Sequence, residues 1–138
     1  MRFMIMVRAN ALTESETMPD PKIMAEMATF HEELMKAGVL LDASGLKPSS
    51  KGARIRYRNG KRTFIDGPFA ETKELIAGYT VIQTRTREEA LEWARRFPAP
   101  FGDDDGEIEI REFFELDDFP PNEAVDRFRE MGLEKKKP

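Results

Sequence analysis

The chain has 138 residues, of which 40% are hydrophobic and 35% are charged, with a formal net charge of −4 at pH 7. This length is typical of one domain with a single core, and the hydrophobic content excludes a disordered chain. Cysteine is absent, which excludes disulfides, thiolate catalysis and cysteine-ligated metal sites and suits a reducing cytoplasm. No leader pattern precedes the first strand and no apolar run reaches the ~18 residues of a membrane span, so we expect a cytoplasmic protein without membrane contact.

The first part of the chain predicts a strand, a helix and a second strand. Residues 2–8 place apolar side chains on both faces, which predicts a strand that is buried on both sides. Asp20 is a good N-cap with Pro21 in the first helical position, and Gly38 is a natural terminator, so a helix of about 17 residues with a wide apolar stripe is expected. Residues 39–42 then predict a short strand that leads into a loop.

The strongest local signal is the dipeptide Asn59-Gly60 at the centre of residues 53–66. Asn-Gly is favoured where both central residues of a two-residue turn need positive φ, so the segment predicts a β-hairpin. A two-residue loop also sets the register, because Arg58 must then pair with Lys61 and each earlier residue with its later counterpart.

Charge is distributed unevenly around this hairpin. Residues 51–62 contain six basic and no acidic side chains, whereas residues 103–118 contain nine acidic side chains and one basic one. We expect these two segments to attract each other within the fold or across a subunit interface, or the basic segment alone to attract an anionic ligand.

Two further elements follow the hairpin. Residues 74–84 predict a long strand in which Gly78 marks a bulge or a close backbone approach. Thr86 caps a helix that Pro98 ends, because proline cannot continue the helical hydrogen bonds. Residues 107–116 predict a last strand that is interrupted by a slip or bulge at its two phenylalanines.

A final helix is predicted from Asn122 to Gly132. Without the hairpin and this helix, the element order is βαββαβ, the split pattern of ferredoxin-like domains. We therefore predict an α+β fold with an inserted β-hairpin and a C-terminal helix, in which residues 1–116 form the domain and residues 117–138 a helical extension and tail. Both helices of such a fold cover one face of the sheet, and burial of the other face against a second copy predicts a homodimer.

Five short segments carry a resemblance to a known family. They are Ala37-Gly38-Val39-Leu40-Leu41, Gly45-Leu46-Lys47-Pro48-Ser49, Asp66-Gly67-Pro68-Phe69-Ala70-Glu71-Thr72-Lys73-Glu74, Gly78-Tyr79 and Glu88-Glu89-Ala90-Leu91-Glu92-Trp93-Ala94. In this order they resemble the DGPF group of YCII-related proteins over about residues 1–115. The resemblance implies a dimeric α+β barrel with a cleft near the signature loop, which is residues 66–74. Members of this group are often encoded beside extracytoplasmic-function sigma factors, which implies a regulatory context and an association with such a factor.

The same resemblance bears on the one histidine. Smaller YCII-related domains look like enzymes that use a His–Asp pair, and alignment through Ala37-Gly38 places that His at Met27 and the Asp near Lys36. His31 lies one turn later on the same face, as a displaced substitute. Because imidazole exchanges protons near neutral pH, His31 is a candidate general base, with Asp42 at the end of the next strand. The alternative, a buried and hydrogen-bonded structural histidine, is the commoner role.

The signature loop supplies the other polar candidates. Asp66, Glu71 and Lys73 are close in sequence, and carboxylates beside an amine in a partly closed cleft can act as acid and base. Phe69 anchors the loop and, with Glu74, is a candidate substrate contact. The alternative is a salt-bridged loop stabiliser in which Asp66 caps backbone N–H groups, and both readings stay open.

Together these features favour a small-molecule enzyme, a lyase, isomerase or hydrolase, in a dimer-associated cleft where Arg54 clamps an anion and Asp42 contacts the substrate. No metal-ligand spacing, phosphate loop, nucleophile elbow or dinucleotide fingerprint is present, so we expect neither a metal nor another cofactor. The alternative is a non-catalytic ligand-binding or protein-interaction module. A third, weaker alternative, suggested by fold analogy alone, is an accessory oxidoreductase-like barrel. Nucleic-acid binding through the basic hairpin is disfavoured, because the chain is acidic overall.

Overall fold

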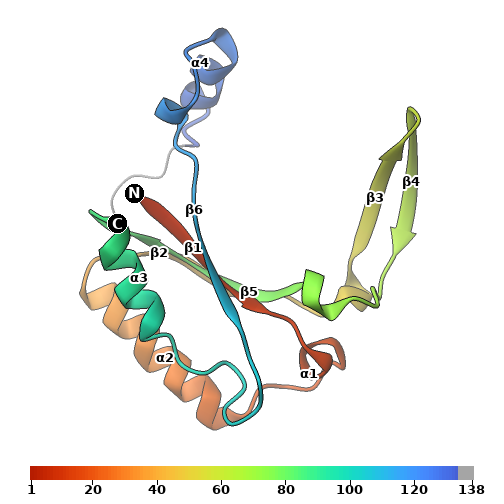
Figure 1. Ribbon diagram of the computed structural model, residues 1–138, viewed down its shortest axis with the longest axis vertical. Coiled ribbons are helices and arrows are strands. Elements are labelled where there is room, and N and C mark those ends of the chain that lie inside the picture. Colours follow the sequence, from red (N-terminus) through yellow and green to blue (C-terminus); the bar gives the residue numbers. More distant parts are fainter. Residues whose placement is uncertain (134–138) are drawn as a thin grey trace.

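The computed structural model describes residues 1–133 and contains a four-stranded sheet with two helices on one face (Figure 1). Two further elements, a hairpin and a short terminal helix, stand away from this body. The elements in chain order are β1 (Arg2–Arg8), α1 (Ala11–Glu14), α2 (Pro21–Lys36), β2 (Leu40–Gly45), η1 (Ser49–Lys51), β3 (Ala53–Arg58), β4 (Lys61–Asp66), η2 (Thr72–Glu74), β5 (Ile76–Gln83), α3 (Arg87–Arg95), β6 (Ile108–Glu112), η3 (Leu116–Asp118) and α4 (Glu123–Glu130).

The sheet has the strand order β2-β5-β1-β6, and every neighbouring pair is antiparallel. Helix α2 connects β1 to β2, and α3 connects β5 to β6, so the two crossovers are those of a βαββαβ unit. The predicted ferredoxin-like α+β fold, with its inserted hairpin and C-terminal helix, is confirmed. No helix within residues 1–133 is both long and apolar enough to cross a membrane.

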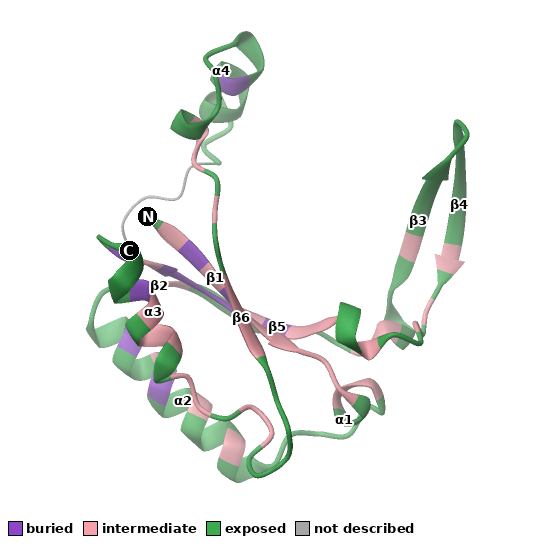
Figure 2. Ribbon diagram, in the orientation of Figure 1, coloured by how far each residue is buried: buried purple, intermediate pink, exposed green. Residues whose placement is uncertain are grey.

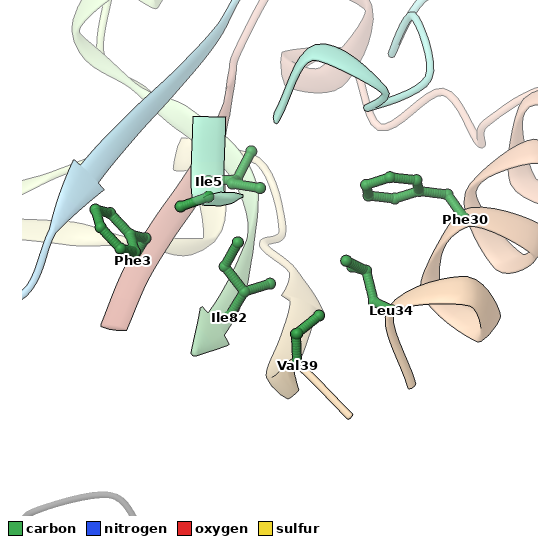
Figure 3. Packing of buried hydrophobic residues seen from close by; sticks show 7 residues of the cluster. Phe3, Ile5, Phe30, Leu34, Val39 and Ile82 are labelled. Carbon is green, nitrogen blue, oxygen red and sulfur yellow. The ribbon is translucent and has the colours of Figure 1, made fainter. Parts of the chain in front are cut away.

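The core lies between the sheet and α2. Alternation along β1 and β5 turns Phe3, Ile5 and Ile82 toward the helices, where Phe30 and Leu34 meet them (Figure 3). Burial of side chains of this size stabilises the fold by about 1.5–3 kcal/mol each, which makes this cluster its main support. The opposite face of the sheet carries the alternate residues, Met4, Met6, Tyr79 and Val81 among them.

The predicted bounds of α2 are confirmed because its caps form. The Asp20 side chain accepts a hydrogen bond of 2.8 Å from the Lys22 N–H, and Gly38 takes a φ of 73° after the last turn. The segment between β1 and α2 contains the short helix α1, because the side chains of Asn10 and Thr13 cap each other's backbone N–H groups.

Strand β2 is longer than predicted and continues to Gly45. Its last residues pair with Tyr79 and Gly78 of β5, and a Cβ atom on Gly78 would lie only 3.0 Å from the carbonyl oxygen of Ser44. The predicted close backbone approach at Gly78 is therefore present. It allows two residues that resemble a loop in sequence to join the sheet.

The hairpin β3–β4 has the predicted register in every pair, from Arg58 with Lys61 to Ala53 with Asp66. Asn59 and Gly60 take φ values of 50° and 73°, as the two-residue turn requires. The hairpin forms a separate two-stranded sheet that projects from the body and is largely exposed along its length (Figure 2).

Residues 113–133, here the C-terminal arm, project at another end of the molecule (Figure 1). Helix α4 begins at the predicted N-cap, where the Asn122 side chain accepts from the Val125 N–H at 2.9 Å. Only Val125 of this arm is buried, and Phe128 and Met131 are exposed to solvent. The predicted tail, residues 135–138, lies outside the described residues.

Candidate functional site

A cavity of about 810 Å³ lies between the N-terminal half of α2 and the sheet. Two loops complete its wall, one between β1 and α2 and the other after α3. Its lining is mainly apolar and includes Val7, Leu12, Met18, Ile23, Met24, Met27, Ala28, His31, Ala43, Gly45, Gly78, Thr80, Phe97 and Phe101.

The space exists because the sheet presents small residues at this end. Around Phe30 and Leu34, large side chains from β1 and β5 fill the gap between helix and sheet. Toward the start of α2, the facing positions are Ala43, Gly45 and Gly78, which leave the helix without a large partner. The same glycines that bring β2 close to β5 therefore also open the cavity.

His31 lies on the wall of this cavity, half-buried, with both ring nitrogens engaged. Nδ1 is 2.7 Å from the carbonyl oxygen of Met27, and Nε2 is 2.8 Å from the hydroxyl oxygen of Thr80. A carbonyl oxygen can only accept, so Nδ1 carries the proton and donates it. In the neutral ring Nε2 then accepts from the hydroxyl of Thr80, whose side chain is buried.

Aromatic neighbours hold the imidazole in place. The rings of Phe30 and Phe97 meet it edge to face, with centroid distances of 5.7 and 6.3 Å. A backbone carbonyl thus does for Nδ1 what a carboxylate does in a His–Asp pair, because it sets the tautomer and the ring orientation. The arrangement offers one basic nitrogen and one hydroxyl to a molecule in the cavity.

The charged side chains that line the cavity are acidic. Among residues 1–133, Asp20 and Asp104 are the only charged side chains of the lining, which includes no lysine or arginine. Asp20 is already engaged as the N-cap of α2. The electrostatics of this wall therefore disfavour a phosphate or carboxylate, which would find no cation to pair with in this part of the chain.

The signature loop lies elsewhere. Asp66, Glu71, Lys73 and Glu74 are exposed, and none of them lines the cavity. The charged candidates of the signature loop are therefore not brought to the cavity that His31, the alternative base, lines. Lys73 connects the signature loop to β1 through its backbone, because its carbonyl oxygen accepts a hydrogen bond from the Arg8 guanidinium.

Arg54 and Phe69, also predicted to contact a substrate, form a pair with each other. The guanidinium carbon lies 3.9 Å from the centroid of the Phe69 ring, a cation–π contact. The Phe69 N–H donates to the Ser49 hydroxyl at 3.0 Å. Ser49 in turn donates to the Glu14 carboxylate from its backbone N–H at 3.0 Å and from its hydroxyl. These contacts join the hairpin base to η1 and α1.

The close backbone contact at Gly67 explains why the signature loop has a glycine at this position. A Cβ atom at this position would lie 1.7 Å from the carbonyl oxygen of Ser49, so no larger residue fits without moving the backbone. The Gly67 N–H also donates to the Gly52 carbonyl oxygen at 3.0 Å. The turn at Gly67-Pro68 thus closes the hairpin against η1.

Asp42 lies on the face of the sheet opposite the cavity, away from His31. The Tyr79 hydroxyl donates to its Oδ2 at 3.3 Å. The negative charge of Asp42, with a smaller contribution from desolvation, raises the pKa of Tyr79 above its ordinary value. Asp42, predicted to act with His31, is instead hydrogen-bonded to Tyr79.

Thr80 is the main site residue that sequence reasoning missed. It shares a strand face with Gly78 and Ile82, so alternation alone assigns it to the helix-covered side of the sheet. Its pairing with His31 depends on β5 being a central strand, which the sequence does not show. Among residues 1–133, no group of three or more histidine, aspartate and glutamate side chains is placed to hold a metal ion.

Comparison with known proteins accounts for most of the chain. The family model for the YCII-related domain matches residues 1–117, which include the sheet, both covering helices and the hairpin. An uncharacterised protein of Rhizobium meliloti (strain 1021) is 34% identical over 76 residues, which are 55% of this chain and 61% of that protein. The chain thus spans less than two thirds of that relative. Since the family match extends over the complete βαββαβ unit, the chain belongs to the YCII-related family.

Proposed function

We propose that this YCII-related domain binds a mainly apolar, uncharged or cationic small molecule in the cavity beside α2 and uses His31 to move a proton on it. The observation that carries this proposal is the position of His31 Nε2, an acid–base atom on the wall of an otherwise apolar cavity. The volume of about 810 Å³ lies within the ~300–1,000 Å³ that is usual for small-molecule sites.

The chemistry that suits one base in such a place is proton abstraction from carbon or oxygen, as in an isomerase or a lyase. In the neutral ring Nε2 holds the lone pair, and the Thr80 hydroxyl can turn from it toward the ligand when the ligand's proton arrives. Nδ1 stays bonded to the Met27 carbonyl throughout, so the imidazolium that forms keeps a hydrogen-bond acceptor. The mainly apolar lining lowers the local dielectric constant relative to bulk water, which strengthens these interactions.

The test begins with a thermal-shift screen of three sets of apolar compounds that are neutral, cationic or anionic. Selective binders stabilise the folded state according to the ratio of their concentration to the dissociation constant. We expect hits among the neutral and cationic compounds. The hits are then incubated in D2O, and nuclear magnetic resonance follows the exchange of ligand protons for deuterium, which detects proton transfer even when the product is unidentified.

His31→Gln keeps hydrogen-bonding capacity without a basic nitrogen, so it should retain binding and lose exchange by about 10²-fold or more. The double substitution Glu71→Gln and Lys73→Met is the matched control, because it removes the charged candidates of the signature loop. It should leave both properties unchanged. Exchange that survives in His31→Gln and fails in the loop variant would overturn the proposal in favour of the signature loop. Binding without exchange in the unmodified protein would leave a ligand-binding module.

A further inference from the structure

The loop between α3 and β6 forms part of the wall of the cavity beside α2. It runs from the end of α3 past the start of α2 before it enters β6 (Figure 1). Pro100, Phe101 and Asp104 of this loop line the cavity. Because Asp104 is also exposed to solvent, it lies at the mouth, whereas His31 contacts the buried Thr80 hydroxyl inside the cavity.

Close backbone contacts hold this loop in place. A Cβ atom on Gly102 would lie 3.6 Å from Cδ1 of Ile23, so the loop packs directly on α2. A Cβ atom on Gly106 would lie 3.0 Å from Cδ2 of Phe101, so the chain folds back over that ring. The Asp104 N–H donates to the Phe101 carbonyl oxygen at 3.1 Å. Phe101 and Asp104 therefore belong to one turn, whose backbone is fixed at the mouth of the cavity.

Asp104 differs from Asp20, the other charged residue of the lining. The Asp20 carboxylate accepts from the Lys22 N–H as the N-cap of α2. The side chain of Asp104 has no hydrogen bond or ion pair with any residue of the described range 1–133. A carboxylate at the mouth of an apolar cavity attracts a positive charge. An ammonium group suits it, because its N–H groups donate to carboxylate oxygens and the Phe101 ring of the same wall also attracts a cation.

We propose that the ligand of this cavity is an amine whose ammonium group pairs with Asp104 at the mouth, while its apolar body extends toward His31. This assignment rests on the proposed function, because the same cavity must hold the ligand. It goes further in naming the chemical class: cationic ligands are preferred to neutral ones with the same apolar body. Asp104 is then a specificity-determining residue, distinct from the acid–base group His31.

Two series of compounds that differ only in their end group test this preference. With a 4-phenylbutyl or an n-hexyl body, each series contains an amine, an alcohol and a carboxylate, and isothermal titration calorimetry measures their dissociation constants. The amine should bind about fivefold more tightly than the alcohol, because an ion pair near solvent adds only modestly to affinity. The carboxylate should bind most weakly. Added salt should reduce the difference between amine and alcohol, since it screens an exposed ion pair.

Substitutions of Asp104 should change this order in a defined way. Asp104→Asn removes the charge without removing the backbone N–H of the turn, so amine and alcohol should then bind equally. Asp104→Lys should favour the carboxylate. Asp105→Asn is the matched control, because it makes the same change of charge in the same loop on a residue outside the lining. Asp20→Asn is a second control, since asparagine caps a helix as well as aspartate does, and both controls should still prefer the amine.

The outcomes separate the amine preference from the proposed function. An alcohol that binds as tightly as the amine would overturn the assignment of Asp104 and leave binding in the cavity and proton transfer by His31 intact. The same holds if Asp105→Asn or Asp20→Asn lowers the preference as much as Asp104→Asn does. If no compound of either series binds, both proposals are overturned. Circular dichroism checks that each variant is folded.

Discussion

The cavity beside α2 and the base of the hairpin β3–β4 are built from opposite kinds of sequence. The cavity is formed by small residues of the sheet and by the apolar stripe of α2, which includes one histidine. No short sequence motif marks it. The hairpin base is rich in turn residues and charges, but the charged side chains of its signature loop, residues 66–74, are exposed. The signature motif closes the base of the hairpin, whereas the apolar stripe of α2, which contains no known motif, places His31 on the cavity wall.

The difference has a physical basis. Water screens the charges of an exposed loop, so carboxylates and amines there influence each other weakly. The cavity lining is mainly apolar and screens charges and dipoles less than bulk water does, so a single imidazole hydrogen-bonded to a buried hydroxyl would have more effect on a bound molecule. Each of the following experiments would strengthen this contrast or remove it.

The largest effect on stability is expected at Gly67. Gly67→Ala places a methyl group where the Ser49 carbonyl oxygen now lies, so the hairpin base must move away from η1. We expect a loss of about 2–3 kcal/mol in the free energy of unfolding, measured by urea denaturation. Ligand affinity of the folded protein should not change, because the signature loop does not line the cavity.

Gly52→Ala is the control for this change. Its Cβ would lie 3.6 Å from the same oxygen, an ordinary contact, so stability should change by no more than about 0.5 kcal/mol. Equal stability of the two variants would show that the close approach at Gly67 is not what requires glycine. Loss of ligand binding in Gly67→Ala alone would return the signature loop to the functional site.

A smaller effect, on binding alone, is expected when the cavity is filled. Ala28 lines it from an exposed position on α2, so Ala28→Phe should occupy part of the space at little cost in stability. Affinity for the compounds found by thermal shift should fall by about tenfold or more, as isothermal titration calorimetry would show. Ala25→Phe on another side of the same helix is the control. If Ala28→Phe binds as tightly as the unmodified chain, the ligand lies outside this cavity.

Much of the fold could be predicted because its signals are local. Asp20 with Pro21 and Gly38 frame α2, and Asn59-Gly60 sets the hairpin register, since capping and turn conformations depend on a few adjacent residues. The extension of β2 to Gly45 depends on a contact with a distant strand. The sequence around Ser44 and Gly45 resembles a loop, and these residues join the sheet only because β5 lies beside them. Local sequence does not show this partner strand, so the sequence does not predict the extension.

The candidate site was harder to predict for the same reason. His31 was identified because it is the one histidine and lies within the apolar stripe of α2. Its hydroxyl partner Thr80 is 49 residues away, and the empty space depends on the pairing of Gly45 in β2 with Gly78 in β5. The charged residues of the signature loop are candidates in the sequence because they lie close together along the chain. Proximity along a loop does not determine which side chains face a common space.

The pairing of His31 with Thr80 should contribute a moderate amount of stability. Thr80→Val removes the hydroxyl from a buried position and leaves Nε2 without its donor, which should cost about 1 kcal/mol in the free energy of unfolding. A double-mutant cycle with His31→Leu measures the coupling by urea denaturation. Thr29→Val, on the exposed part of α2, is the control and should be nearly neutral. A coupling indistinguishable from zero would mean that the hydrogen bond does not orient the imidazole.

The smallest effect concerns Tyr79, whose side chain points to the face of the sheet opposite the cavity. Its raised pKa means that the folded state favours the neutral phenol, chiefly because an ionised hydroxyl would face the Asp42 carboxylate. The resulting stabilisation is fully present below the unfolded-state pKa of about 10 and is lost as pH rises through the folded-state value. The chain has two tyrosines, so Tyr57→Phe leaves Tyr79 as the sole phenol for titration by ultraviolet absorbance. In that background Asp42→Asn should lower the midpoint toward the ordinary value. An unchanged midpoint would separate Asp42 from Tyr79 and leave desolvation as the cause of the shift.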